Sequence, residues 1–476
     1  MFRILAIAVL LAVGLPLFAQ NSLNQDLPES DSLRARAIYD DALTQSEVYS
    51  NLSELCTDIG GRLSGSEGAE KAVDWAYDKL VAMGADSVWK QPVMVPHWVR
   101  GDVEKASVHV DGKSKEIPVT ALGGSVGTEG VIRAGVVEVF RFEDLERLGR
   151  EQIEGKIVLY NRPMQPRLIN TFEAYSGCVD QRGSGASEAA PYGAVAVLVR
   201  SMNLRMDDLP HTGVQRYKEG VNQIPAAAVS TNAAAELSRA LRENPDLEVS
   251  LELSCENLPD ALSYNVIAEI KGSEYPDEII LVGGHLDSWD LGQGAHDDGA
   301  GSVQSMEVIN SFIRMGIRPK RSIRCVLFMN EENGARGAVK YAEEAARLKE
   351  NHIVAIESDR GGFSPRGFTV DGLEYISGPA LKQLKSWASV FAPYGIHSLT
   401  PGFAGVDINY LKDQGVILMG LVPDSQRYFD FHHAKNDRIE GVNKRELELG
   451  SASLVTLIDL IDRYGPVSDQ LPERKY

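Results

Sequence analysis

The chain has 476 residues, of which 43% are hydrophobic and 24% are charged. This composition is typical of a soluble globular protein and excludes disorder over most of the chain, and the length predicts two or three domains. The formal net charge of −19 argues against a nucleic-acid partner, because nucleic-acid binding depends on basic contacts to phosphates.

Residues 1–19 have the pattern of a secretory signal peptide. Arg3 supplies a short positive segment, an apolar run extends from Ile4 to Val13, and the small residue Ala19 precedes the expected cleavage point. The apolar run is too short for a membrane span, which needs about 20 residues. We therefore expect an exported protein, periplasmic or extracellular, without stable membrane insertion.

Three further segments differ in their hydrophobic patterns. Residues 20–114 are predicted to be the first part of a main domain, in which residues 67–84 have the apolar spacing of a helix that ends at Gly84. Residues 115–258 combine short apolar runs with two amphipathic stretches and predict a small α/β insertion. Residues 259–476 alternate apolar strands with helices, which predicts the second part of the main domain, built on a largely buried sheet.

The four cysteines form no C-x-x-C pair, so neither a thiolate zinc site nor a redox motif is indicated. Cys325 lies within an apolar run, which is typical of a buried free thiol. Export would permit a disulfide, and Cys178 with Cys255 is one pair that such a chain could form.

Polar residues follow several of the predicted strands in the last segment. In open α/β sheets, ligands bind in the crevice beyond the carboxyl ends of the strands, so residues far apart in the sequence can meet there. Carboxylates and imidazoles without thiolates suit a catalytic zinc site. The residues are, in chain order, His285 and Asp287 after the run 278–284, Asp297 before a helix, Glu331 and Glu332 after the run 322–330, Asp359 after the run 352–358, and His432 and His433 near the end.

The doublet Glu331–Glu332 has a further property. Successive side chains of extended backbone point to opposite sides, so one carboxylate can bind a metal while its neighbour accepts a proton from metal-bound water. Zinc lowers the pKa of that water toward roughly 7, and a nearby carboxylate can then take the proton near neutral pH.

Each of these features also has an ordinary structural explanation. The run Asp297-Asp298-Gly299 is typical of a turn and helix N-cap, and adjacent glutamates are typical of a solvated turn. Asp359 is compatible with a capping carboxylate. A metal site is favoured because all of these residues occur in one chain, each at the end of a predicted element, and the ordinary explanation would need several unrelated coincidences.

Four motifs together resemble the two-zinc aminopeptidase-type metallopeptidases. They are GGHLDSWDLGQGAHDDGAG, MNEENGARGA, ESDRGG and FHHAKND, and the early segment IGGRLSGSEGAEKAVDWAYDKL agrees with them. The resemblance covers nearly all of the chain after residue 19. It implies an α/β fold with a mixed, largely parallel sheet flanked by helices, a protease-associated α/β domain inserted at 115–258, and a homodimer.

The resemblance also implies a role for each matching residue and two Zn²⁺ per chain. His285, Asp297 and Asp359 would hold one zinc, and the bridging Asp297 would hold the second with Glu332 and His433. Glu331 would be the general base, and Asp287 would orient His285. His433 is chosen over His432 because the last ligand of the family lies four residues before an aspartate, which is Asp437 in this chain.

The chain departs from the family pattern at two positions. Arg438 follows Asp437 where threonine is usual, and His296 adds an imidazole beside the bridging aspartate. We interpret His296 as a residue that does not bind metal, because the family set already fills both sites.

These inferences predict an exopeptidase that hydrolyses dipeptides or short peptides by metal-activated water, with Glu331 as general base. One alternative is an aminopeptidase that acts on longer peptides. Another is a metal-free receptor or binding module of the same fold, which the complete ligand set and Glu331 argue against.

Overall fold

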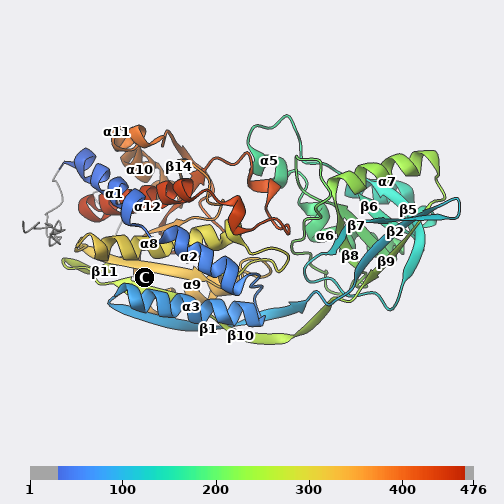
Figure 1. Cartoon of the computed structure of the whole chain (residues 1–476), viewed down its shortest axis with the longest axis horizontal. Coiled ribbons are helices and arrows are strands. Elements are labelled where there is room, and N and C mark those ends of the chain that lie inside the picture. The colour runs from blue at the N-terminus through green and yellow to red at the C-terminus, as the bar shows by residue number, and fades with distance from the viewer. Residues whose placement is uncertain (1–29, 467–476) are drawn as a thin grey trace, which may run out of the picture.

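A computed structural model describes residues 30–466 and contains two mixed β-sheets, each covered by helices (Figure 1). The predicted signal peptide, residues 1–19, lies outside the described residues. In the part of the chain that is described, no helix is both long and apolar enough to cross a membrane.

The first sheet has the strand order β1-β10-β12-β11-β13-β16-β14-β15. Its centre is parallel, because β12, β11, β13 and β16 run in one direction, and antiparallel neighbours flank this centre on both sides. The strands are β1 Ser87–Val99, β10 Glu256–Ile270, β11 Tyr275–His285, β12 Arg321–Phe328, β13 Asn351–Glu357, β14 Pro365–Asp371, β15 Ser398–Pro401 and β16 Ile417–Pro423.

Helices cover both faces of this sheet, which explains why its central strands are apolar without alternation. Ile280 and Val282 of β11 belong to the apolar cluster that includes α3, α8 and α12, whereas Leu281 packs on the opposite side with Tyr341 of α9. The helices of this part are α1 Asp31–Gln45, α2 Val48–Glu54, α3 Glu67–Met83, α8 Ala300–Arg314, α9 Arg336–Leu348, α10 Glu374–Ser386, α11 Ala388–Phe391 and α12 Lys444–Tyr464.

The second sheet has the order β3-β2-β9-β5-β6-β7-β8-β4, with β5 to β8 parallel. Its strands run from Glu104 to Leu253, whereas the sequence placed this unit at 115–258; the hairpin β2–β3 belongs to it because β2 pairs with β9. The elements are β2 Glu104–Val110, β3 Lys113–Ile117, β4 Val119–Ala121, β5 Ile132–Val139, β6 Ile157–Tyr160, β7 Ala196–Arg200, β8 Ala226–Val229, β9 Glu248–Leu253, α4 Phe142–Ile153, α5 Thr171–Ser176, α6 Asp180–Ala189 and α7 Thr231–Glu243.

The long strands β1 and β10 carry the chain into and out of the second sheet. They pair antiparallel from Ser87 opposite Glu269 to Val99 opposite Glu256. Figure 1 shows them leading from the larger lobe, which is built on the first sheet, toward the smaller second lobe, which is built on the second sheet. The predicted mixed α/β fold is therefore confirmed, and the second sheet interrupts the first between β1 and β10.

All four cysteines are buried and free. The pairing of Cys178 with Cys255 is wrong, because the two thiols belong to different apolar clusters of the second lobe. Cys178 packs with Tyr160, whereas Cys255 packs with Trp98.

Candidate active site

Three neighbouring parallel strands deliver polar residues to one edge of the first sheet. His285 is the last residue of β11, Glu331 and Glu332 follow β12, and Asp359 follows β13. Asp297 lies in the short helical turn Ala295–Gly299 that leads into α8. The predicted crevice at the carboxyl ends of the strands thus collects the residues that the sequence singled out.

His285, Asp297 and Asp359 form one group of ligand atoms. The Nε2 atom of His285 lies 3.4 Å from Oδ1 of Asp297 and 3.5 Å from Oδ1 of Asp359. One ligand atom from each of the three residues lies within 4.8 Å of the other two. This spacing suits a single metal ion that replaces the direct contacts.

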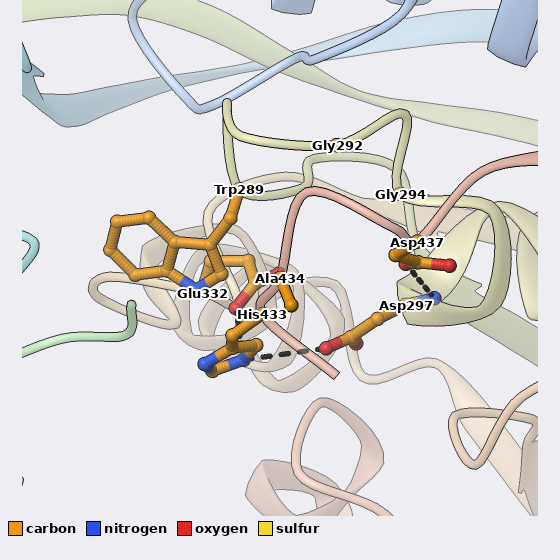
Figure 2. Close-up of a pocket in the computed structure, with 8 residues that line it drawn as sticks. All are labelled: Trp289, Gly292, Gly294, Asp297, Glu332, His433, Ala434 and Asp437. Carbon is orange, nitrogen blue, oxygen red and sulfur yellow. Dashed lines mark hydrogen bonds and ion pairs between the residues drawn. The ribbon is translucent and has the colours of Figure 1, made fainter. Parts of the chain in front are cut away.

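The other oxygen of Asp297 faces a second group. The Nε2 atom of His433 lies 3.3 Å from Oδ2 of Asp297 and 3.1 Å from Oε2 of Glu332. Figure 2 shows His433 and Asp297 joined by an ion pair beside Trp289 and Glu332. Asp297 therefore divides its two oxygens between two imidazoles, as a bridging ligand would.

His432 lies close to the same carboxylate. Its Nε2 atom is 3.7 Å from Oδ2 of Asp297, and its ring stacks on that of His433 with centroids 3.5 Å apart. The ion pair with Glu332 is made by His433. The choice of His433 as the ligand stays a prediction, which this contact supports.

Zinc fits this donor set. Among the described residues, Oδ2 of Asp297, Oε1 of Glu332 and Oδ1 of Asp359 are buried and form no hydrogen bond. Burial and the neighbouring Asp297 charge raise the pKa of Glu332 to about 7. Carboxylates this close cannot all ionise without cations beside them, and oxygen with imidazole ligands is a combination that zinc favours.

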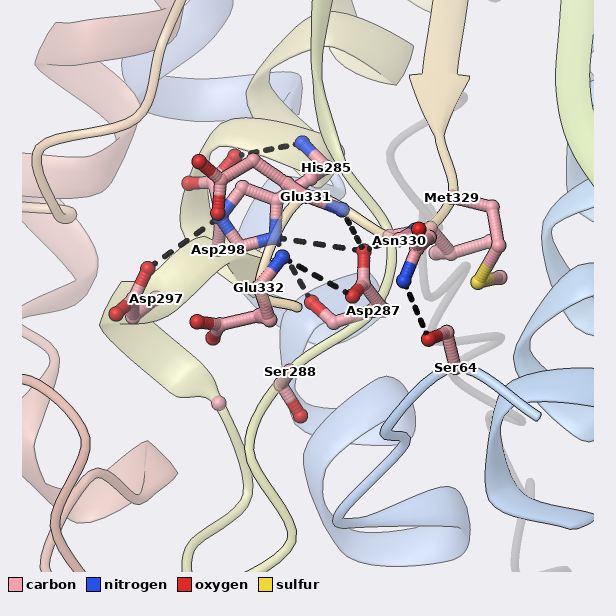
Figure 3. A network of polar contacts seen from close by, with 12 residues as sticks. Ser64, His285, Asp287, Ser288, Asp297, Asp298, Met329, Asn330, Glu331 and Glu332 are labelled. Atoms are coloured by element: carbon pink, nitrogen blue, oxygen red, sulfur yellow. Dashed lines mark hydrogen bonds and ion pairs between the residues drawn. The ribbon is translucent and has the colours of Figure 1, made fainter. Parts of the chain in front are cut away.

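Asp287 holds the glutamate doublet in place. Its Oδ1 accepts hydrogen bonds from the amides of Asn330 at 2.7 Å and Glu331 at 3.0 Å, and its Oδ2 accepts one from the amide of Glu332 at 3.4 Å (Figure 3). Nδ1 of His285 lies closer to the backbone carbonyl of Asp287, at 2.9 Å, than to its carboxylate, at 3.8 Å. Sequence reasoning predicted contact with His285 and missed the contacts with the doublet.

Asp437 positions the bridging aspartate. Its Oδ1 accepts from the amide of His296 at 2.8 Å, and its Oδ2 accepts from the amide of Asp297 at 3.1 Å. Figure 2 shows the second of these bonds, between two residues that line a pocket with Trp289, Glu332 and His433. The sequence singled out Asp437 as a landmark, and the structure places it against the backbone of a ligand.

Both ring nitrogens of His296 are engaged away from the ligand groups. Nδ1 accepts from the amide of Gly362 at 3.2 Å, and Nε2 lies 3.2 Å from the carbonyl of Gly441. The ring stacks on Phe363 with centroids 4.1 Å apart. This geometry supports the interpretation that His296 does not bind metal.

Two residues of the second lobe contact the site although no sequence motif identified them. The carbonyl oxygen of Thr212 lies 3.3 Å from Nδ1 of His433, and the guanidinium of Arg182 lies 3.2 Å from the same nitrogen. Nothing in the local pattern around Arg182 or Thr212 distinguishes them, because their importance comes from contact with a residue more than 200 positions away.

Comparisons with known proteins agree with this geometry. The model of "Peptidase family M28" matches residues 265–456. The chain is 37% identical to carboxypeptidase Q of Bos taurus over 410 residues, which covers 86% of this chain and 84% of the relative. It is 38% identical to carboxypeptidase Q of Homo sapiens over 418 residues, which covers 87% of this chain and 85% of that relative.

Solved structures give the same result. The crystal structure of a peptidase M28 precursor from Shewanella amazonensis superposes with a TM-score of 0.86 at 34% identity and covers 91% of this chain and 96% of the other. A zinc aminopeptidase from Bacillus subtilis superposes with a TM-score of 0.62 at 19% identity, covering 91% of this chain and 95% of the other, which shows a shared fold.

Proposed function

Because the chain belongs to peptidase family M28, we propose that it is an exported exopeptidase that uses two zinc ions to hydrolyse dipeptides or short peptides. Family membership makes the chain a zinc-dependent exopeptidase; the number of ions, the substrate length and the export are the proposal. The observation that carries it is the division of the Asp297 oxygens between His285 and His433.

We assign the ligands as the resemblance implied. His285, Asp297 and Asp359 would hold one ion, and Asp297, Glu332 and His433 would hold the other. When bound, zinc lowers the pKa of coordinated water toward roughly 7 and polarises a carbonyl oxygen. Asp287 and Asp437 orient the backbone that carries these ligands, through the amides of the glutamate doublet and of Asp297.

Glu331 acts as general base in this proposal. Its Oε2 lies 4.0 Å from Nε2 of His285, so the carboxylate borders the ligand group without belonging to it. The Asp287 carboxylate accepts a hydrogen bond from the backbone amide of Glu331 and so fixes the position of the Glu331 backbone. From there Glu331 takes a proton from the attacking water and passes it to the leaving amine.

The second lobe is proposed to be a protease-associated insert that shapes access to the site. A groove between the lobes is lined by Glu104, Thr120 and Asp208 from the insert and by Leu291 and Lys435 from the peptidase part. Export is supported by the signal-peptide pattern at residues 1–19, and a homodimer by the family resemblance.

Replacement of the base tests the assignment. Glu331→Gln is expected to lower kcat for a dipeptide by about 10²- to 10⁴-fold, because the amide cannot accept the proton. Zinc content, measured by elemental analysis, should stay near two per chain as the proposal requires. Glu343→Gln on the exposed side of α9 is the matched control and should leave both values unchanged. Full activity of the Glu331 variant would show that the base is another residue.

Substrate profiling separates the dipeptidase from an aminopeptidase on longer peptides. Hydrolysis of dipeptides is compared with that of peptides blocked at the amino terminus or at the carboxyl terminus. A dipeptidase requires both free termini, whereas an aminopeptidase accepts carboxyl-blocked and longer substrates.

A further inference from the structure

The guanidinium of Arg182 is buried beside the ligand group without a charged partner. Arg182 belongs to α6 of the insert and is 7% exposed. Its Nη1 lies 3.2 Å from Nδ1 of His433, and its Nη2 donates to the hydroxyl of Tyr175 at 2.6 Å. Among residues 30–466, no carboxylate forms an ion pair with Arg182, and its Nε has no hydrogen-bond partner.

A buried cation without an anion is unfavourable, because the desolvation of the charge is not compensated. A neighbouring arginine at the lobe junction is compensated. Arg100 pairs with both Glu104 and Asp290. The planar guanidinium of Arg182 keeps donors free, and these match a carboxylate in two-pronged geometry.

Metal binding by His433 increases this mismatch. If Nε2 of His433 binds a metal, Nδ1 must carry the proton, and the carbonyl of Thr212 at 3.3 Å is then its acceptor. In that tautomer Nδ1 cannot accept a hydrogen bond from Arg182. The zinc-competent site therefore leaves Nη1 of Arg182 with the Thr212 carbonyl, at 3.5 Å, as its acceptor, and no anion neutralises the guanidinium.

Tyr175 of α5 adds a second donor to the same place. Its ring packs edge-on against His432, with centroids 5.3 Å apart, and its hydroxyl accepts from Arg182. Because the hydroxyl accepts this bond, its own proton is available for a substrate oxygen. Gly213 packs closely against the guanidinium and requires the absence of a side chain, since a Cβ there would lie 2.5 Å from the guanidinium carbon of Arg182.

We propose that Arg182, together with Tyr175, binds the free α-carboxylate of the substrate and so makes the enzyme selective for dipeptides. The guanidinium contacts Nδ1 of His433, and only the imidazole ring separates it from Nε2, the proposed metal-binding atom. One residue of extended chain spans about 3.3–3.6 Å, so a carboxylate one residue beyond the scissile bond is within reach of the guanidinium. The inference rests on the proposed function and names the insert as the source of its specificity.

The test compares alanyl-leucine with alanyl-leucine amide, which lacks the charged terminus. The wild-type enzyme is expected to favour the free acid in kcat/KM. Arg182→Met should lower kcat/KM for the acid by roughly 10- to 100-fold, as expected for a lost hydrogen bond to a charged group, and should change the value for the amide less than about 3-fold. Arg182→Lys should recover part of the preference, because the charge remains.

Two further variants complete the test. Tyr175→Phe should reduce the preference for the acid several-fold through loss of one donor, and it serves as an independent variant if Arg182→Met does not fold. Arg200→Met removes a partly buried arginine of the insert that contacts Asn161 and Met206, and should leave the preference unchanged.

The outcomes separate this inference from the proposed function. If Arg182→Met and Tyr175→Phe lower kcat/KM equally for the acid and for the amide, Arg182 and Tyr175 only support His433 structurally, and the proposed carboxylate site is wrong. Equal wild-type hydrolysis of acid and amide also overturns it, while the peptidase assignment stands. If neither substrate nor any longer peptide is hydrolysed, the proposed function fails together with the inference.

Discussion

At the scale of single residues, the site depends on the ligands and equally on carboxylates that accept hydrogen bonds from the backbone amides beside them. Asp287 organises the glutamate doublet, and Asp437 organises the bridging Asp297. Outer residues of this kind commonly change metal affinity or activity by about 10- to 100-fold when they are replaced. They decide the orientation of ligands that the sequence identifies by type alone.

Asp437→Ala is therefore expected to lower kcat/KM by about 10- to 100-fold and to weaken zinc binding, because the amides of His296 and Asp297 lose their acceptor. Activity as a function of free zinc measures both effects. Asp413→Asn, at an exposed position, is the control and should match the wild type. Unchanged zinc affinity in the Asp437 variant would contradict the positioning role.

At the scale of elements, the long helix α12 supports the sheet that carries the ligands. It packs in the cluster shared by α3, α8 and the central strands, and Leu457 within it is fully buried. Removal of a buried leucine side chain leaves a cavity as well as lost apolar contact.

Leu457→Ala is expected to destabilise the peptidase part by about 2–5 kcal/mol, which thermal unfolding would show as a lower midpoint. Leu348→Ala is the matched control, because Leu348 of α9 is 52% exposed and such a change is usually within about 0.5 kcal/mol. Equal midpoints for the two variants would mean that the cluster around α12 is not a stabilising core.

At the scale of the whole molecule, the two ligand groups join segments that are far apart in the chain. His285, Glu332 and Asp359 lie at or just beyond the ends of β11, β12 and β13. Nδ1 of His433 lies 3.3 Å from the backbone carbonyl of Thr212, which belongs to the insert. Bound zinc would therefore tie both lobes to one centre and relieve the repulsion among buried carboxylates.

Removal of zinc by a chelator is expected to lower the unfolding midpoint of the whole protein, and added zinc should restore it. A ligand present at 1,000 times its dissociation constant stabilises the folded state by about 4 kcal/mol. Magnesium is the control, because it prefers six oxygen ligands and should restore little. A midpoint that does not respond to zinc would contradict a metal centre at these residues.

Much of the site could be predicted from local patterns. Apolar runs that lead into His285, into the Glu331–Glu332 doublet and into Asp359 encode both a strand and the position of a site residue, since parallel strands end at one edge of the sheet. The peptidase family and the mixed α/β fold were recognised from the same segments and are confirmed. The residue roles stay predictions until the variants are measured.

Other features were not visible in the sequence. The start of the second sheet at Glu104 depends on the pairing of β2 with β9, and the separation of Cys178 from Cys255 depends on which apolar cluster each joins. Arg182 and Thr212 meet His433 across the lobe boundary. A ligand motif is local and survives in the sequence, whereas contacts across the two lobes arise from packing between segments more than 200 residues apart, so they exist only in the folded chain.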